Sequence, residues 1–174
     1  IETPRRLVCI SRPRRFGKSF AAQMLCAYYD KSCNSLNLFQ DLEIAGKKDF
    51  MTHLNRYDVI YLNMTDVLGE TSAKDFIGFI KRNIVRELAE AYPSLIVVEG
   101  FGATLVNAVQ AAGNKFIMII DEWDAPIRET PEIQREYLEF LRTLFKSSAT
   151  TAKTFAAVYM TGILPIKKDG SQSA

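Results

Sequence analysis

The sequence predicts an α/β domain built on a mostly parallel sheet, and two observations lead to that prediction. Four short apolar runs alternate with segments whose apolar residues recur at steps of three and four. The runs are apolar almost throughout, which is typical of strands that helices cover on both faces. With 174 residues, 48% of them hydrophobic, we expect residues 1–174 to form one domain around a substantial core.

The boundaries of the strands and helices follow from these patterns. The apolar runs are the predicted strands, at Leu7–Ile10, Val59–Met64, Phe116–Ile120 and Phe155–Met160. Helices are predicted from Lys18 to about Asp30, from Ala73 to Tyr92 and from about Ala103 to Ala112. Thr71 or Ser72 offers an N-cap for the second helix, and Pro131 opens a fourth. Residues 31–57 are less periodic and predict short turns or a small helix.

Charge is nearly balanced overall but uneven along the chain. Lys and Arg number 22 against 20 for Asp and Glu, which excludes a uniformly basic nucleic-acid coat. Six of the cations fall within the first 18 residues, where we expect a polyanion to bind. Three cysteines without metal-ligand spacing, no membrane-length apolar run and no signal peptide predict a cytoplasmic protein with reduced thiols. Because the chain starts at Ile1 rather than Met, we expect it to be part of a longer protein.

The segment ISRPRRFGKS, residues 10–19, predicts a phosphate-binding loop. A predicted strand precedes it, a helix follows, and its end matches G-x-x-x-x-G-K-[ST] except for Arg12 at the first glycine. In such a loop glycine lets the backbone approach the phosphates, lysine reaches the β- and γ-phosphates, and the hydroxyl binds Mg²⁺. The alternative is a surface turn that ends in GKS by chance, which the flanking strand and helix disfavour. The expected nucleotide-binding residues are Arg14, Arg15, Phe16, Gly17, Lys18, Ser19 and Phe20.

A pair of acids ends the third predicted strand, in KFIMIIDEWD, residues 115–124. Ligands of open α/β sheets bind at the carboxyl ends of the strands. We therefore expect Asp121 to hold Mg²⁺ and Glu122 to act as the catalytic residue that positions the attacking water. The alternative is two acids that open a loop. Asp124 starts the turn-forming sequence Asp-Ala-Pro, so we expect it to have a structural, capping role.

Polar residues also end the other predicted strands. Thr161 follows the last strand, where P-loop ATPases with an inserted strand place a sensor of the γ-phosphate or the water. We count Thr161 as a candidate catalytic residue, the alternative being a hydroxyl that only ends the strand. Asn63 and Thr65 are weaker candidates at the second strand.

Three segments, CISRPRRFGKS, IIDEWDAPI and YMTGILPIKKDGSQSA, carry a family resemblance. They resemble the bacterial AAA-ATPase-like family, whose longer members have a C-terminal domain of the PD-(D/E)XK nuclease superfamily. Its loop reads R-P-R-R-F-G-K-[ST], so Arg12 fits the family. The resemblance implies a three-layer P-loop NTPase fold, RecA- and AAA-like, with sheet order 1-4-3-2. It also implies Lys18 and Ser19 on the phosphates and Mg²⁺, Asp121 on Mg²⁺ and Glu122 as the hydrolytic base.

Binding partners follow less directly. No Glu-x-Lys triplet occurs, so we expect no nuclease activity from these residues and regard the nuclease-like domain as a missing partner. Nucleic-acid binding is not favoured, because only Arg5-Arg6 and Lys167-Lys168 extend the basic patch. Whether Arg14 and Arg15 serve the nucleotide or a second polyanion stays open. In a homo-oligomer a neighbouring copy can supply an arginine to the site, and the candidates are Arg128, Arg135 and Arg142.

These patterns together predict a Mg²⁺-dependent domain that binds and hydrolyses ATP and couples the nucleotide cycle to a conformational change. ATP and Mg²⁺ are the expected ligands. Two other functions fit the same loop: a nucleotide-binding switch or scaffold with little hydrolysis, and a small-molecule kinase. The glutamate directly after Asp121 favours water as the acceptor of the phosphoryl group.

Overall fold

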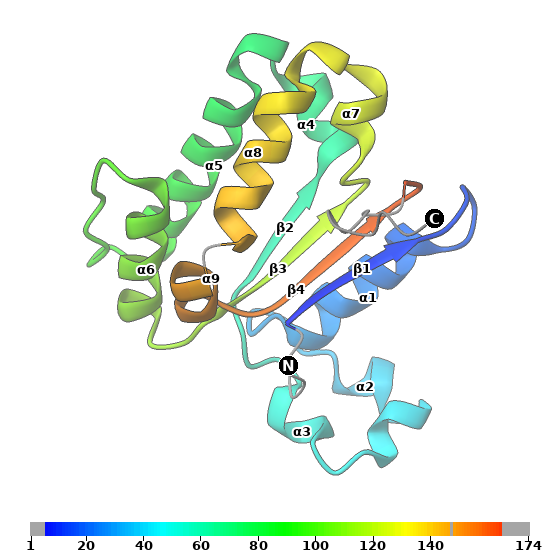
Figure 1. Cartoon of the computed structure of the whole chain (residues 1–174). Coiled ribbons are helices and arrows are strands. Elements are labelled where there is room, and N and C mark those ends of the chain that lie inside the picture. Colours follow the sequence, from blue (N-terminus) through cyan, green and yellow to red (C-terminus); the bar gives the residue numbers. More distant parts are fainter. Residues whose placement is uncertain (1–5, 147, 165–174) are drawn as a thin grey trace.

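A four-stranded parallel sheet forms the centre of the fold (Figure 1). The structure is a computed structural model that describes residues 6–146 and 148–164. The strands are β1 (Leu7–Ser11), β2 (Val59–Asn63), β3 (Phe116–Asp121) and β4 (Phe155–Gly162). They lie in the order β1-β4-β3-β2, all parallel, which confirms the predicted order.

Helices of very different lengths connect the strands. They are α1 (Lys18–Tyr29), α2 (Leu36–Phe39), α3 (Phe50–His53), α4 (Met64–Glu70), α5 (Phe76–Ala91), α6 (Phe101–Ala112), α7 (Ala125–Glu129), α8 (Gln134–Lys146) and α9 (Ser148–Thr154). Short 3₁₀ turns span Glu43–Gly46, Ala73–Asp75 and Pro131–Ile133. Among the described residues, none of the helices combines the length and the apolar character needed to cross a membrane.

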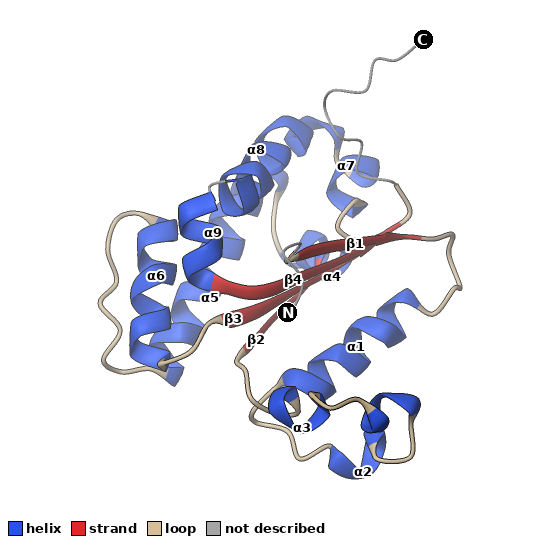
Figure 2. Cartoon of the chain, turned by 60° about the horizontal axis from the view of Figure 1, so that its bottom comes forward, coloured by secondary structure: helices blue, strands red, loops and turns tan. Residues whose placement is uncertain are grey.

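The sheet lies between two helical layers, so the fold has three layers (Figure 2). On one face α1 packs Ala22 against Ile117 and Ile119 of β3. On the other face Met118 and Ile120 join the core that α5, α6 and α8 cover. Alternate residues of β3 thus face opposite layers, and the whole strand is buried. Burial on both faces explains why this segment is apolar at nearly every position.

Parallel pairing brings the carboxyl ends of the strands to one edge of the sheet. Asn63 at the end of β2 lies opposite Asp121 at the end of β3. Ser11 at the end of β1 lies opposite Gly162 at the end of β4. The loop after β1 leads directly into α1 at this edge, so the predicted phosphate loop and acid strand meet there (Figure 1).

The second strand is one residue shorter than predicted. It ends at Asn63, and Met64 is the first residue of α4. The reason is an N-cap: the Asn63 side-chain oxygen accepts hydrogen bonds from the backbone N–H groups of Thr65 (3.0 Å) and Asp66 (3.4 Å). An asparagine that accepts hydrogen bonds from two free N–H groups favours a helix that starts at the next residue. The strand prediction extended to Met64 because that residue is apolar.

Two helix starts also differ from the predictions. A 3₁₀ turn precedes α5, which therefore begins at Phe76 rather than Ala73, and Ser72 makes no side-chain cap. Pro131 opens another 3₁₀ turn, so α8 begins at Gln134. The short helices α7 and α9 have 5 and 7 residues and were not predicted. Segments of two turns or fewer are too short to display a helical period.

The three cysteines are free thiols. Burial raises the pKa of Cys26 to about 11, and it also raises the pKa of the half-buried Cys9. Both side chains therefore remain protonated at neutral pH, which makes them poor nucleophiles.

Candidate nucleotide site

An open pocket of about 500 Å³ lies at the carboxyl ends of the strands. Its lining comes from the loop after β1, the start of α4 and the turn after β3: Arg14, Arg15, Gly17, Lys18, Ser19, Phe20, Asn63, Thr65, Asp66, Glu122, Arg128 and Glu129. The predicted phosphate loop and Glu122 thus share one pocket. Another hollow, of about 320 Å³ between α5, α6 and α8, contains none of the predicted site residues.

The loop after β1 has the backbone geometry of a tight turn into a helix. Gly17 is left-handed, with φ of 71°, and occupies the N-cap position of α1. Arg15 is left-handed as well, with φ of 69°. The first N–H groups of a helix have no partner within the helix, and its N-terminus has a positive partial charge. The start of α1, at Lys18 and Ser19, therefore presents donors at the pocket, as an anion site requires.

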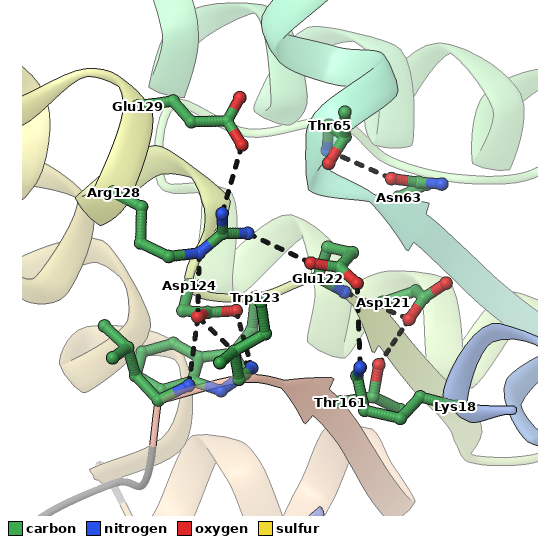
Figure 3. Close-up of polar contacts among 12 residues, drawn as sticks. Lys18, Asn63, Thr65, Asp121, Glu122, Trp123, Asp124, Arg128, Glu129 and Thr161 are labelled. Carbon is green, nitrogen blue, oxygen red and sulfur yellow. Dashed lines mark hydrogen bonds and ion pairs between the residues drawn. The ribbon is translucent and has the colours of Figure 1, made fainter. Parts of the chain in front are cut away.

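Lys18 links the loop to the acid turn. Its side chain is only 5% exposed, and its ammonium donates a hydrogen bond to the carbonyl oxygen of Pro13 at 3.1 Å. The same ammonium lies 3.9 Å from Glu122 Oε1 (Figure 3). The lysine is thus held between the loop backbone and the predicted base.

The side chains of Asp121, the last residue of β3, and Glu122, the residue after it, point in different directions, as the sequence predicts for neighbours at a strand end. Glu122 lines the pocket, whereas Asp121 is fully buried and does not. Asp121 Oδ1 accepts a hydrogen bond from the Glu122 N–H at 3.1 Å and another from the Thr161 hydroxyl (Figure 3). Thr161 is itself fully buried, outside the pocket lining. Its hydroxyl therefore contacts the Asp121 carboxylate and not the pocket.

Tyr61 is a neighbour of this acid pair that the sequence analysis missed. Its hydroxyl donates to Asp121 Oδ2 over 3.5 Å. Burial, followed by the charge of Asp121, raises the pKa of Tyr61 to about 12. The phenol therefore stays protonated and remains a donor. The available signal was a hydroxyl-bearing aromatic residue within the otherwise aliphatic run of β2, two positions before Asn63.

Asp124 is structural, but it does not cap α7 as predicted. The side chain makes no capping hydrogen bond to that helix. It is instead fully buried and accepts hydrogen bonds from the N–H groups of Ile163 (3.2 Å) and Leu164 (3.0 Å), which follow β4. It also accepts one from Arg128 Nε at 3.0 Å. A buried carboxylate needs such partners, and β4 and α7 supply them from outside its own turn.

Arg128 belongs to the pocket of its own chain. Its Nη2 donates to Glu122 Oε2 at 3.0 Å, and its Nη1 donates to Glu129 at 3.3 Å (Figure 3). Sequence reasoning found this residue only as a candidate arginine for a neighbouring subunit. The stronger signal was its spacing, since Asp124 and Arg128 are four residues apart at the start of a helix.

The side-chain oxygens at this edge of the sheet are of the type that binds Mg²⁺. The Ser19 hydroxyl lines the pocket, and Asp121 Oδ2 accepts only the long bond from Tyr61 among the described residues. Hydroxyl and carboxylate oxygens are the ligands that Mg²⁺ prefers. The described residues contain no group of three or more His, Cys, Asp or Glu side chains that could hold a metal. Mg²⁺ in nucleotide sites is usually held by one or two side chains together with phosphates and water, so two protein donors suffice.

Most of the predicted nucleotide-binding residues come together, with one exception. Arg14 and Arg15 line the pocket, and so does Phe20, although its side chain is 68% exposed. Phe16 is equally exposed and lies outside the lining. Of the other predicted basic residues, Arg6 lies outside the pocket lining and donates to the carbonyl oxygen of Ala152 at 3.1 Å. Arg5, Lys167 and Lys168 lie outside the described residues.

Comparison with known proteins gives the family. A protein of Azotobacter chroococcum mcd 1, named "Uncharacterized protein in vnfD 5'region", is 28% identical to this chain over 142 residues. The match covers 78% of this chain and 26% of that protein, so the chain spans about a quarter of its relative. No solved structure matches the chain. The family described as "Predicted AAA-ATPase" matches residues 1–171, and its P-loop core agrees with the parallel 1-4-3-2 sheet. The chain therefore belongs to the AAA-ATPase-like family.

Proposed function

We propose that this chain binds ATP with Mg²⁺ and hydrolyses it. The observation that supports this best is the position of Lys18 and Glu122, which face each other at 3.9 Å in one pocket at the carboxyl edge of the sheet. A phosphate-loop lysine and an acid at the end of β3, which β4 separates from β1 in the sheet, are charges that ATP hydrolysis uses. The membership of the chain in a family of predicted ATPases agrees with this proposal.

The loop binds the triphosphate. The free N–H groups at the start of α1 donate to phosphate oxygens, and the Lys18 ammonium moves from the Pro13 carbonyl and Glu122 to the β- and γ-phosphates. A triphosphate bears more negative charge than a carbonyl and one carboxylate, so this exchange is favourable. Arg14 and Arg15, which line the same pocket, add positive charge to the phosphate side.

Glu122 acts as the general base. Its carboxylate orients a water molecule and accepts a proton as the water oxygen attacks the γ-phosphorus, while the bond to the β-phosphate oxygen breaks and ADP leaves. Ser19 and Asp121 would hold Mg²⁺, and the metal ion would neutralise charge on the phosphate oxygens. Thr161 and Tyr61 act on this site through Asp121, whose carboxylate they orient.

The nucleotide cycle is also proposed to drive a conformational change. Asp124 joins Arg128, in the site, to the segment that follows β4. A shift of the turn after β3 would therefore move that segment as well.

Binding is tested by titrating ATP and Mg²⁺ against the wild type, Lys18→Ala and the control Lys47→Ala, whose side chain is 68% exposed. Removal of a charge-assisted contact to the triphosphate weakens binding by about one to two orders of magnitude in Lys18→Ala. Lys47→Ala keeps the wild-type affinity. Equal affinity of all three proteins would refute the phosphate loop.

Hydrolysis is tested separately by measuring free phosphate with no added acceptor. The wild type releases phosphate and Glu122→Gln loses about two orders of magnitude or more in rate, because glutamine cannot accept the proton. A wild type that binds ATP but is as inert as Glu122→Gln would be a nucleotide-binding switch. Formation of ADP and a phosphorylated acceptor, without free phosphate and only after a small acceptor is added, would point to a kinase.

A further inference from the structure

Arg128 has contacts that neither nucleotide binding nor the fold accounts for. Its guanidinium lies in the pocket, 20% exposed, and pairs with carboxylates on three sides: Glu122, Asp124 and Glu129. An arginine that serves only as a surface ion pair contributes little and needs no buried partner. Here one partner, Asp124, is completely buried.

Asp124 fixes the orientation of Arg128. The carboxylate accepts from Nε of Arg128 at 3.0 Å, and it is held in turn by the N–H groups of Ile163 and Leu164. Three donors from two separate segments determine where the Asp124 oxygens lie. Because the guanidinium is planar and rigid, a fixed Nε leaves the two terminal nitrogens little freedom. One of them, Nη2, is thereby directed at Glu122.

Glu122 is held in one orientation by the same contact. Oε2 of its carboxylate accepts from Arg128 at 3.0 Å, whereas Oε1 is 3.9 Å from the Lys18 ammonium, on the side of the phosphate loop. Oε1 is thus the oxygen that faces the expected γ-phosphate. The backbone of Glu122 is left-handed, with φ of 51°, a conformation that costs free energy for any residue except glycine. Strain that persists at a site residue points to a constrained functional position.

We propose that Arg128 is a positioning residue for Glu122, acting within its own chain. It holds Oε2, so that Oε1 is directed toward the water at the γ-phosphate once the triphosphate has drawn Lys18 away. The inference rests on the proposed function, because it assigns Glu122 the role of base. It also assigns Arg128 to the site of its own chain rather than to that of a neighbouring subunit, since its guanidinium is engaged there.

The experiment is a double-mutant cycle on hydrolysis, measured with kcat and the ATP affinity of each protein. Arg128→Ala lowers kcat by about ten- to a hundredfold, as expected when a base is misplaced, with ATP affinity changed by less than about threefold. In a Glu122→Gln background, Arg128→Ala changes kcat by less than about twofold, because Arg128 has no base left to orient. Arg128→Lys restores part of the rate. Arg86→Ala, on the exposed side of α5, is the control and keeps the wild-type kcat.

The outcomes separate this inference from the proposed function. Equal losses from Arg128→Ala with and without Glu122, or a loss of ATP affinity with kcat unchanged, would show that Arg128 acts on the nucleotide and would overturn the inference alone. A higher rate in Arg128→Ala would also overturn it, because the ion pair would then restrain the base. Arg128→Lys, which keeps a cation beside Asp124, gives the same comparison if Arg128→Ala does not fold. A wild type that binds ATP without hydrolysing it would overturn both.

Discussion

Left-handed backbone conformations concentrate at the candidate nucleotide site. Of the described residues with positive φ, Arg15, Gly17 and Glu122 line the pocket. Glycine adopts this conformation without strain, whereas arginine and glutamate do so at a cost of about 1 kcal/mol or more. The loop and the acid turn therefore use conformations that local preference disfavours. At the scale of single residues, the backbone geometry of the candidate site is maintained at a cost in stability.

Substitution of Gly17 tests the cost of the left-handed backbone in the loop, because the chain contains a matched control glycine. Gly17 and Gly113 both have φ of 71°, and a Cβ on either would meet no atom within 4 Å. Gly17→Ala and Gly113→Ala should therefore lose similar stability, about 1 kcal/mol each, from backbone strain alone. Urea unfolding measures both values.

Only Gly17 lies where phosphates are expected. Gly17→Ala should therefore weaken ATP binding by about tenfold or more, since a side chain prevents close approach of the loop backbone. Gly113→Ala, at the C-cap of α6, should bind ATP as the wild type does. Equal ATP affinity in the two variants would argue against phosphate contacts at the backbone of the loop.

At the scale of elements, the end of β4 and the start of α7 are joined through one buried carboxylate. Asp124 binds the N–H groups after β4 and the Arg128 side chain of α7. The backbone N–H of Trp123 also donates to the backbone carbonyl of Thr161 at 2.9 Å. These contacts keep the turn after β3 beside the end of β4. Glu122 lies in that turn, so the two strand ends together determine where the side chain of this proposed base points.

Gly162 at the end of β4 is packed too closely for any side chain. A Cβ there would lie 2.5 Å from Asp124 Oδ1 and 2.6 Å from Trp123 Nε1. Gly162→Ala should therefore destabilise the protein by about 1–3 kcal/mol through overpacking, and it should also lower the rate of hydrolysis by displacing Asp124 and Arg128. Urea unfolding and phosphate release measure the two effects.

Gly69 in α4 is the control for that change. A Cβ on Gly69 would meet nothing within 4 Å, and the residue lies in a helix. Gly69→Ala should leave stability unchanged or raise it by up to about 1 kcal/mol. If both alanine variants unfold at the same urea concentration, the packing around Gly162 is looser than described.

At the scale of the whole molecule, β3 supports both helical layers. Its residues Ile117 and Ile119 contact the α1 layer, and Met118 and Ile120 belong to the core under α5, α6 and α8. The candidate phosphate loop leads into the N-terminus of α1, while Asp121 ends β3 and Glu122 follows it. The distance between Lys18 and Glu122 therefore depends on how α1 packs on the sheet.

Ile119→Ala tests how tightly α1 packs on the sheet. Ile119 is completely buried, so its truncation should cost about 2–5 kcal/mol of unfolding free energy from lost burial and the cavity left behind. Ile96 is 70% exposed, and Ile96→Ala should cost less than about 0.5 kcal/mol. Chemical denaturation followed by circular dichroism compares them. A small effect of Ile119→Ala would indicate that α1 is only loosely packed on the sheet.

Sequence reasoning succeeded where the signal is local or strongly periodic. The predicted strands, the long helices and the tight turn between β1 and α1 depend on apolar runs, helical spacing and a short motif, all of which are readable along the chain. Short elements gave no such signal, which is why α4, α7 and α9 were missed. The resemblance to a family provided the strand order, which the structure confirms.

The sequence alone determined which residue types are available: the Gly-Lys-Ser loop after a strand, the acids after another strand, and a core large enough for one domain. Only the tertiary structure decided how they are used. It buried Thr161 against Asp121, made Asp124 a link between β4 and α7, and placed Arg128 against Glu122. The physical reason is that these contacts join residues from different strands and turns. Their partners depend on the packing of the sheet and its helices, which no local pattern encodes.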